Sequence, residues 1–385
     1  MEKHFDYIIS GAGCAGMSVL ARMMQDQFFS DKKILIIDAA LKNTNDRTWC
    51  FWEQQPGVFE SIVYHRWNQL IVQSIDGMVQ SAIQPYQYKM IRGIDLYNYV
   101  KELAAAKPNI TWITAKVLGI SHANDEARVE LENEIFTAPQ VINSILFSDT
   151  PLLAKESGSY HLLQHFKGWM IETSEDCFDP DTATFMDFRV SQQEGTTFVY
   201  VLPINQRKAL VEYTLFSATL LADTAYDTAL RNYIEQNLTK ADYTIEHTEW
   251  GVIPMTNHRF KQAEGPIAYI GTAGGQVKAS SGFAFQFIQK RADEIIAMMK
   301  FGRNRSFLEK VAEKKFKLYD SVLLQVLSNQ LLPGDVIFSA LFKKNPVQRI
   351  FRFLDNQSSL GDDYHIMTSV PTRIFLPAAM REMRK

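Results

Sequence analysis

The first forty residues follow the order strand, glycine-rich turn, helix, strand, and this order constrains the fold more than any other feature. An apolar run at residues 7–10 leads into the motif GAGCAG, in which Gly11, Gly13 and Gly16 have the spacing of a dinucleotide-binding turn. In such a turn the first glycine permits the tight bend. The second lets the backbone approach a pyrophosphate, and the third lets the helix pack closely on the strand. The sequence therefore predicts a Rossmann-type start.

A second apolar run, residues 34–37, ends in Asp38. This is the distance at which a carboxylate accepts hydrogen bonds from an adenosine ribose, and its charge disfavours the additional phosphate of NADP. A GxGxxG turn alone also occurs in plain loops. The flanking strand, the helix and the trailing acid together favour a bound dinucleotide.

Composition limits the class of protein. A chain of 385 residues is long enough for two coupled domains, and a net charge of −3 gives no reason to expect nucleic acid. Three scattered cysteines are too few for a disulfide framework or a zinc site, so we expect no metal and a cytoplasmic location. The first strand begins almost at once, which leaves no room for a signal peptide. No apolar run approaches the roughly 18 residues that span a bilayer, so any membrane contact is expected to be peripheral.

Later segments extend the pattern of the first forty residues. After the Rossmann start, a series of short strands is typical of flavin-binding domains of the aromatic hydroxylase type, by analogy of fold. Residues 267–296 again read as strand, glycine-rich loop and helix, with the helix expected to begin near Ser281 and Gly282. In that fold such a loop returns to the dinucleotide and points a helix amino terminus at the flavin ring. The short strands are expected at residues 110–114, 116–121, 127–131, 134–136 and 141–145.

A hairpin of β-formers at residues 196–202 and 209–216 is expected to belong to a substrate domain, and the pattern beyond residue 300 is helical. The expected fold class is α/β (α+β overall): a Rossmann-type flavoprotein fold with an inserted β-sheet substrate domain and a helical C-terminal region. We expect a discontinuous FAD-binding domain at residues 1–60, 90–150 and 260–300, a substrate domain at 61–89 and 151–259, and the helical region at 301–385.

Several unusual strings occur in one order along the chain. They are DRTWCFWE (46–53), IRGIDLYNYV (91–100), QHFKGW (164–169), FMDFRV (185–190), FVYVLP (198–203), ALVEYT (209–214), GVIPM (251–255) and GTAGGQVKASSGF (271–283). With GAGCAG they make the chain resemble the flavin-dependent lycopene β-cyclases over nearly its whole length, and DRTWCFWE and FMDFRV are the most specific.

This resemblance implies an intramolecular lyase, or isomerase, of carotenoid biosynthesis. Such an enzyme closes the ψ-ends of lycopene into β-ionone rings, giving β-carotene through γ-carotene without net electron transfer. In the family, reduced FAD is the active cofactor and NAD(P)H serves only to reduce it. Gly271, Gly274 and Gly275 of the late loop are expected to contact the cofactor, although Thr272 stands where related flavoproteins often have aspartate. Arg92 resembles the arginine that neutralises the FAD pyrophosphate; a solvated surface arginine is the alternative.

Cyclisation needs a shielded acid, because it begins when a proton adds to a terminal double bond. Strand alternation puts Leu210, Glu212, Thr214 and Phe216 on one face, so Glu212 sits in a largely apolar row where burial would raise its pKa. The resemblance also places the catalytic glutamate at this position. An exposed edge-strand glutamate is the alternative. The reduced flavin could stabilise the cation or deliver the proton itself, and the sequence does not separate these roles.

Other side chains are weaker candidates for the substrate pocket. Aromatic residues could line a polyene tunnel and offer cation–π faces, or simply belong to the core. Asp187 and Arg189 could form a buried pair that holds Glu212 or the flavin, or a purely structural ion pair. His165 could be the base for the final deprotonation, although a structural histidine is favoured. The aromatic candidates are Trp49, Phe51, Trp52 and Trp169.

The expected partners are lycopene and other apolar polyenes, together with a membrane surface from which such substrates are drawn. Residues 335–353 combine apolar side chains with Lys343, Lys344, Arg349 and Arg352, which suits an interfacial element or a helical cap on the core. We therefore expect a cytoplasmic, peripherally membrane-associated protein. A flavin monooxygenase, an isoprenoid reductase and a non-catalytic prenyl-binding escort protein are the alternatives, and redox stoichiometry separates the first two from a cyclase.

Overall fold

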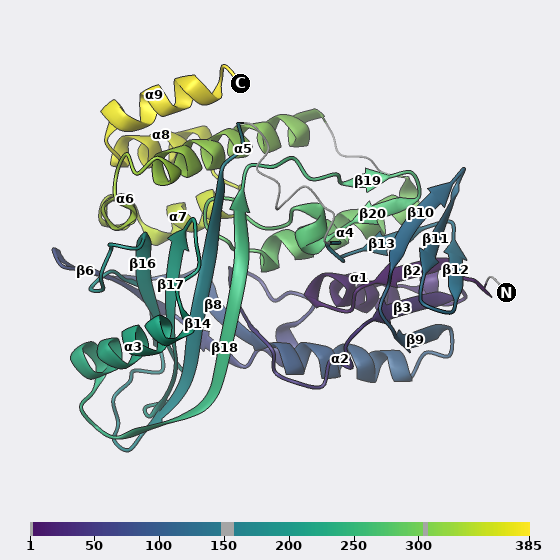
Figure 1. Ribbon diagram of the computed structural model, residues 1–385, viewed down its shortest axis with the longest axis horizontal. Coiled ribbons are helices and arrows are strands. Elements are labelled where there is room, and N and C mark those ends of the chain that lie inside the picture. The colour runs from purple at the N-terminus through teal and green to yellow at the C-terminus, as the bar shows by residue number, and fades with distance from the viewer. Residues whose placement is uncertain (1–2, 148–157, 303–306) are drawn as a thin grey trace.

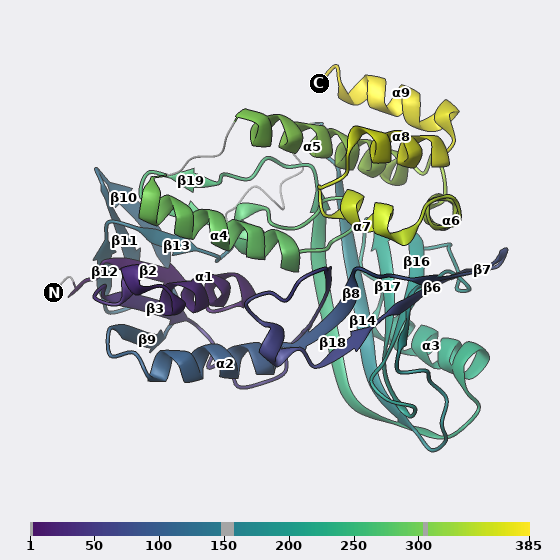
Figure 2. The same ribbon diagram turned by 180° about the vertical axis from the view of Figure 1, so that it is seen from behind.

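The computed structural model describes residues 3–147, 158–302 and 307–385 (Figures 1 and 2). The expected domain boundary between residues 150 and 151 lies outside these ranges, as do residues 303–306 of the expected helical region. The Rossmann-type half lies at one end of the long axis and a large, mainly antiparallel sheet at the other, with helices α5 to α9 along one side. This mixed architecture confirms the predicted fold class.

A six-stranded sheet forms the centre of the Rossmann-type half. The predicted strand, turn, helix and strand are present as β2 (Tyr7–Ser10), α1 (Cys14–Gln25) and β3 (Ile34–Asp38). Five parallel strands follow the order β20–β13–β2–β3–β9, and β19 adds an antiparallel edge. Apolar side chains of α1, α2 and α4 cover one face. The further elements are β9 (Ile110–Thr114), β13 (Val141–Asn143), β19 (Ala263–Glu264), β20 (Ile267–Tyr269), α2 (Gly93–Ala105) and α4 (Phe285–Phe301).

The opposite face is covered by a second sheet of four strands in the order β1–β12–β11–β10. Asn124 has a φ of 54° in the turn between β10 and β11, as its predicted turn role requires. The strand expected at residues 116–121 begins later, at Gly119. The strands are β1 (Lys3–His4), β10 (Gly119–Ala123), β11 (Glu126–Glu130) and β12 (Ile135–Ala138).

The large sheet has seven strands in the order β18–β14–β17–β16–β15–β6–β7. The predicted hairpin is β16 and β17, and residues from the expected 61–89 segment join it as β6 and β7. Helix α3 (Asp223–Tyr233) packs on one face, and helices α6 and α7 pack on the other. The strands are β6 (Gln69–Ser74), β7 (Gly77–Ala82), β14 (His161–Thr173), β15 (Thr182–Asp187), β16 (Thr196–Pro203), β17 (Lys208–Ser217) and β18 (Tyr243–Thr256).

A three-stranded sheet joins the two halves: β4 (Thr48–Glu53), β8 (Gln87–Arg92) and β5 (His65–Trp67). Because side chains alternate along a strand, Trp49 and Phe51 of β4 pack into the core of the Rossmann-type half. Cys50 and Trp52 pack into the core of the large sheet. The expected boundary between residues 89 and 90 falls inside β8, so these strands belong to both halves.

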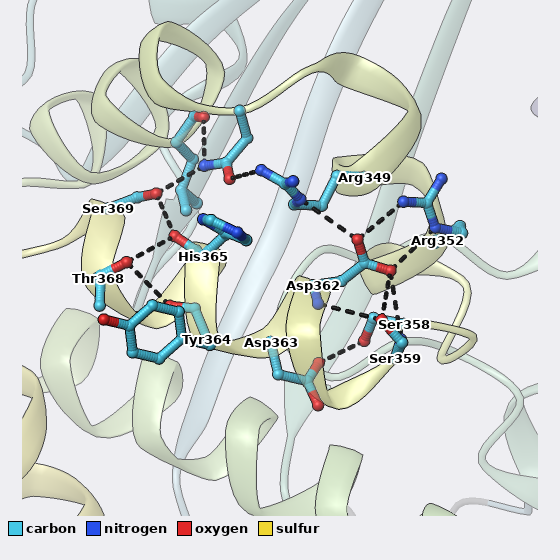
Figure 3. Close-up of polar contacts among 12 residues, drawn as sticks. Arg349, Arg352, Ser358, Ser359, Asp362, Asp363, Tyr364, His365, Thr368 and Ser369 are labelled. Atoms are coloured by element: carbon cyan, nitrogen blue, oxygen red, sulfur yellow. Dashed lines mark hydrogen bonds and ion pairs between the residues drawn. The ribbon is translucent and has the colours of Figure 1, made fainter.

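Five helices follow: α5 (Phe307–Ser328), α6 (Gly334–Lys344), α7 (Val347–Leu354), α8 (Leu360–Ser369) and α9 (Thr372–Glu382). Of the two interpretations of residues 335–353, the structure favours the helical cap on the core. Most of their apolar side chains are buried, with Phe351 fully enclosed against the core of the large sheet, whereas Val336 is exposed. Arg349 and Arg352 both donate to Asp362, and hydrogen bonds from Arg352 and Ser359 hold the pKa of this carboxyl far below its usual range (Figure 3). Apolar and basic periodicity alone does not distinguish a core-facing helix from a lipid-facing one.

Candidate active site

The glycine turn is tightly built at two positions and open at the third. Gly11 has a φ of +96°, and a Cβ added to Gly16 would lie 1.9 Å from the Gly11 carbonyl oxygen. A Cβ added to Gly13 would meet no atom of the described residues within 4 Å. The space beside Gly13, at the amino end of α1, therefore fits a phosphate-bearing ligand.

Asp38 braces this turn. Its Oδ2 accepts a hydrogen bond of 2.7 Å from the Ala12 backbone N–H, and its Oδ1 accepts one of 2.8 Å from Ala40. Each carboxylate oxygen carries a second lone pair, so a ribose hydroxyl remains a chemically suitable additional donor. The predicted ribose contact of Asp38 stays a prediction.

The late glycine loop returns to the start of α1. Gly271 opens a short 3₁₀ turn (Gly271–Gly274) with a φ of +68°, and a Cβ there would lie 2.9 Å from the Ala15 Cβ. Helix α4 begins at Phe285, three to four residues later than expected. The reason is that Gly282 has a φ of +72°, which is not helical, and approaches the Gln164 side chain of β14. The loop thus connects the glycine turn with the large sheet.

Two arginines lie at one end of the β4–β8 strand pair. Arg92 donates two short hydrogen bonds, of 2.6 and 2.7 Å, to Asp95, and its guanidinium lies 4.1 Å from the Tyr64 ring centre. Its predicted pyrophosphate contact stays a prediction. The sequence analysis missed Arg47, whose positive charge acts both on Cys14 in the turn and on Glu249 of the large sheet. The sequence signal that could have found Arg47 was its position in DRTW, directly before β4, whose side chains pack into both halves.

The aromatic side chains of β4 meet the start of α4. Phe51 stacks on Phe285 with ring centres 4.1 Å apart, and Trp49 lies 6.3 Å from the same ring. The Trp49 indole N–H is buried and has no hydrogen-bond partner in the described part of the chain, so a ligand acceptor would satisfy it. Trp52 stacks on Phe351 with ring centres 4.5 Å apart. A small cavity here is lined by Cys50, Phe51, Trp52, Phe283, Phe285, Gln286, Phe287 and Asp355.

Trp169 does not line this cavity. On β14 it pairs with Val211 of β17, next to Glu212, so strand alternation turns it to the opposite sheet face. There it packs in the cluster beneath α3, with the Arg231 guanidinium 5.9 Å from its ring.

The predicted pair of Asp187 and Arg189 forms, with Arg189 Nη2 2.6 Å from Asp187 Oδ2, but it lies away from Glu212. Tyr233 of α3 donates a 2.7 Å hydrogen bond to the same oxygen, so the pair is held on the α3 side of the sheet, which favours the structural alternative. His165 is fully buried, with Nδ1 2.6 Å from the Tyr226 hydroxyl on the α3 side of the sheet. Its structural role stays a prediction.

Glu212 lies on the other face, where it was expected. Leu210 and Phe216 of its row belong to the core that α6 and α7 cover, and the Thr214 hydroxyl donates a 2.8 Å hydrogen bond to Glu212 Oε1. Burial among apolar side chains, with the nearby charge of Glu249, raises the pKa of Glu212 to about 8. A protonated carboxyl at neutral pH is the consequence.

Glu249 of β18 is the residue that the sequence analysis missed. It is 5% exposed, and its Oε2 finds no hydrogen-bond partner among residues 3–147, 158–302 and 307–385. Burial raises its pKa to about 7, while hydrogen bonds from Thr48 and the charge of Arg47 oppose the rise. An acid two residues before GVIPM was the sequence signal for it.

The comparisons with known proteins identify the family of this chain. A family model described as lycopene cyclase protein matches residues 6–381. The chain belongs to the lycopene cyclase family. A lycopene beta-cyclase from Pantoea ananas is 27% identical over 308 residues, which cover 77% of this chain and 75% of that protein.

Solved structures place this lycopene cyclase family member in a wider fold. A flavoprotein/dehydrogenase from Cytophaga hutchinsonii has a TM-score of 0.65 at 12% identity, covering 99% of each chain. A geranylgeranyl bacteriochlorophyll reductase-like protein from Thermoplasma acidophilum has a TM-score of 0.60 at 14% identity, covering 100% of this chain and 99% of that one. At such identities the likeness shows the fold alone.

Proposed function

We propose that this protein is a lycopene β-cyclase that converts lycopene through γ-carotene to β-carotene by acid catalysis without net electron transfer. The observation that carries the proposal is Glu212, a carboxyl group with a pKa near 8 on an apolar sheet face, within a chain of the lycopene cyclase family. A carboxylic acid that stays protonated at neutral pH is the group that a polyene end requires.

The chemistry follows from the placement of this acid. Glu212 would donate its proton to the terminal double bond of a ψ-end, which leaves a tertiary cation. Attack by the neighbouring double bond closes the six-membered ring, and loss of a ring proton forms the β-ionone double bond. One proton enters and one leaves, so mass and electrons are conserved.

The aromatic side chains beside β4 would stabilise the cationic intermediate. Phe51, Trp52 and Phe285 surround the small cavity beside β4 and exclude water that would trap a carbocation. Their ring faces also stabilise positive charge. Trp49 and Trp52 therefore remain proposed pocket residues, one on each side of β4.

FAD is the proposed cofactor, and the residues present fit it. Gly11, Gly13 and Gly16 would hold the pyrophosphate, Asp38 the ribose, and Arg92 the phosphate charge, with the glycines of the late loop closing over the site. The reduced form, maintained by NAD(P)H, would supply negative charge beside the developing cation.

Replacement of Glu212 tests the function. Glu212→Gln keeps the shape of the side chain but removes its acidic proton, so cyclisation should fall by about 10² to 10⁴ while FAD binding persists. The assay follows lycopene with the reduced, FAD-loaded protein under anaerobic conditions, and product mass is read. Glu172→Gln, at an exposed position of β14 in the same sheet, is the matched control.

Parental activity in Glu212→Gln would assign the proton to another group. A product heavier by oxygen or hydrogen would indicate a monooxygenase or reductase instead.

We also propose peripheral membrane association, through α9 rather than through residues 335–353. Leu376, Met380 and Met383 are 55%, 46% and 62% exposed and recur at helical spacing on one face. Arg381 and Arg384 are exposed beside them. Figures 1 and 2 show α9 as the outermost helix of the C-terminal region. None of the helices in the described ranges combines the length and apolar character needed to cross a bilayer.

Flotation with anionic liposomes at low salt tests this surface. The parental protein should float with the vesicles, because apolar burial and basic charge act together. The triple change of Leu376, Met380 and Met383 to Ser should abolish flotation. Met78→Ser, at a 56% exposed position on β7, should not. Equal flotation of the triple variant and the parental protein would exclude α9 as the contact.

A further inference from the structure

Two glutamates flank one glycine in the large sheet. Gly168 of β14 pairs with Glu212 of β17 on one side and with Glu249 of β18 on the other. Directly paired residues point to the same sheet face, so both carboxyl groups project from the face of Gly168. Neighbouring strands are about 4.8 Å apart, which separates the two glutamate Cα atoms by roughly 10 Å.

Gly168 keeps the space between them open. A Cβ at this position would lie 3.1 Å from Glu249 Cγ and 3.2 Å from Leu210 Cδ1, tighter than ordinary van der Waals contact. No other residue type would leave the gap between the two side chains free. The sheet therefore presents two carboxyl groups that converge over a bare stretch of backbone.

Buried titratable groups from neighbouring strands surround the pair. They are Cys50 of β4, Tyr88 of β8 and Tyr200 of β16, and burial together with the glutamate charges raises the pKa of each. Arg47, before β4, is the cation that acts on Glu249. In these apolar surroundings one negative charge is tolerated more easily than two, because like charges at close range oppose each other's ionisation.

We propose that Glu249 is the second catalytic carboxyl of the cyclisation and accepts the ring proton that is lost after Glu212 has donated its own. This role rests on the proposed lycopene cyclase function. In the acceptor step a ring C–H bond breaks, its electron pair becomes the ring double bond, and the proton bonds to a Glu249 carboxylate oxygen. Transfer of that proton across the Gly168 gap to Glu212 restores the starting state, directly or through one water molecule.

The surroundings assign the acceptor role to Glu249 and the donor role to Glu212. Thr48 and Arg47 favour the charged form of Glu249, whereas a single hydroxyl hydrogen bond from Thr214 favours that of Glu212. The buried Glu249 Oε2, which lacks a partner within the described ranges, is an acceptor in need of a proton. Glu249 consequently loses its proton at the lower pH.

The first experiment replaces Glu249 in the full-length, FAD-loaded protein. Glu249→Gln should lower cyclisation of lycopene by about 10² to 10⁴, and Glu249→Asp should recover part of it. In the parental protein the rate should fall below pH about 7, where Glu249 is protonated, and Glu249→Gln should lose this acidic limb. Glu246→Gln, at an exposed position on the same strand, should match the parental protein. A parental rate and an intact acidic limb in Glu249→Gln would overturn the proposal.

A second measurement does not depend on activity. Infrared titration with carbon-13-labelled glutamate should show a protonated carboxyl in the parental protein near neutral pH. Glu249→Gln should lower the pKa of Glu212, because it removes the negative charge that Glu249 carries when Glu212 titrates. Unchanged titration of Glu212 in Glu249→Gln, when the parental enzyme does cyclise lycopene, overturns the pair alone. A parental protein that does not cyclise lycopene overturns the proposed function, and the catalytic role of Glu249 with it.

Discussion

The raised pKa of Glu212 affects both the proposed chemistry and the stability of the folded protein. In the folded protein its pKa is about 8, well above its usual 4.5, because burial disfavours the carboxylate. Between these two pH values the unfolded chain has lost this proton and the folded chain has kept it. The contribution of Glu212 to the free energy of unfolding therefore falls as the pH rises from about 4.5 to about 8, and stays low above that.

Glu212→Gln removes this pH dependence. Relative to the parental protein, its free energy of unfolding should gain little at pH 4.5 and on the order of a few kcal/mol at pH 9. Denaturant titration at several pH values measures the difference. Glu172→Gln, at an exposed position, should show no such trend. A stability difference between Glu212→Gln and the parental protein that does not grow with pH would show that Glu212 is not held in its neutral form.

Individual residues also mark the limit of sequence reasoning. Alternation within one strand was enough to place Glu212 beside Leu210 and Phe216. The sheet face of Trp169 was left open and Glu249 was missed for one physical reason: the register between β14, β17 and β18 decides which side chains share a face. Residues that lie far apart in the chain carry no local signal of that register.

At the scale of elements, the glycine turn separates ligand binding from folding. Gly13 has extended backbone dihedrals and open space where a Cβ would stand, whereas a Cβ on Gly16 would collide with the backbone of Gly11. The two glycines therefore have different tasks, as their positions in the motif predict.

We expect Gly13→Val to fold and to lose FAD, because its side chain fills the space beside the α1 amino terminus. Gly16→Val should lower the thermal midpoint of the protein even without FAD, because the helix must move away from the turn. Flavin absorbance after reconstitution and thermal unfolding of the apoprotein measure the two effects. Full flavin occupancy in Gly13→Val would exclude this turn as the phosphate site.

The elements with a local cause were predictable. The β2–α1–β3 unit, the hairpin of β16 and β17 and the C-terminal helices follow from periodicity and turn residues. The start of α4 was misjudged because Gly282 has a positive φ and lies close to Gln164, on a strand more than a hundred residues earlier. For helices α6 and α7 the sequence left a lipid-facing and a core-facing interpretation open, because their apolar faces do not reveal what covers them.

The whole molecule depends on contacts that join its segments. Lys278, between the late glycine loop and α4, has a fully buried side chain whose Nζ donates hydrogen bonds to Asp320 of α5 and to Asn356 after α7, at 2.6 and 2.8 Å. Ser280 donates to the same Asp320 oxygen. These contacts tie the proposed flavin loop to the C-terminal helices, and no pattern in the sequence pairs positions so far apart.

Breaking this link should therefore affect both stability and cofactor binding. Lys278→Ala leaves the carboxylate of Asp320 buried without its cation, which should cost about 3–5 kcal/mol of unfolding free energy. The double variant Lys278→Met with Asp320→Leu should recover much of the loss, because it buries no unpaired charge. FAD should bind more weakly in Lys278→Ala, since the loop that would close over it is no longer fixed.

Lys261→Ala, which breaks the exposed pair with Glu264, should change stability by less than about 1 kcal/mol. Thermal and denaturant unfolding with FAD titration measure these effects. If Lys278→Ala unfolds like Lys261→Ala, the pair does not hold the loop to the helices.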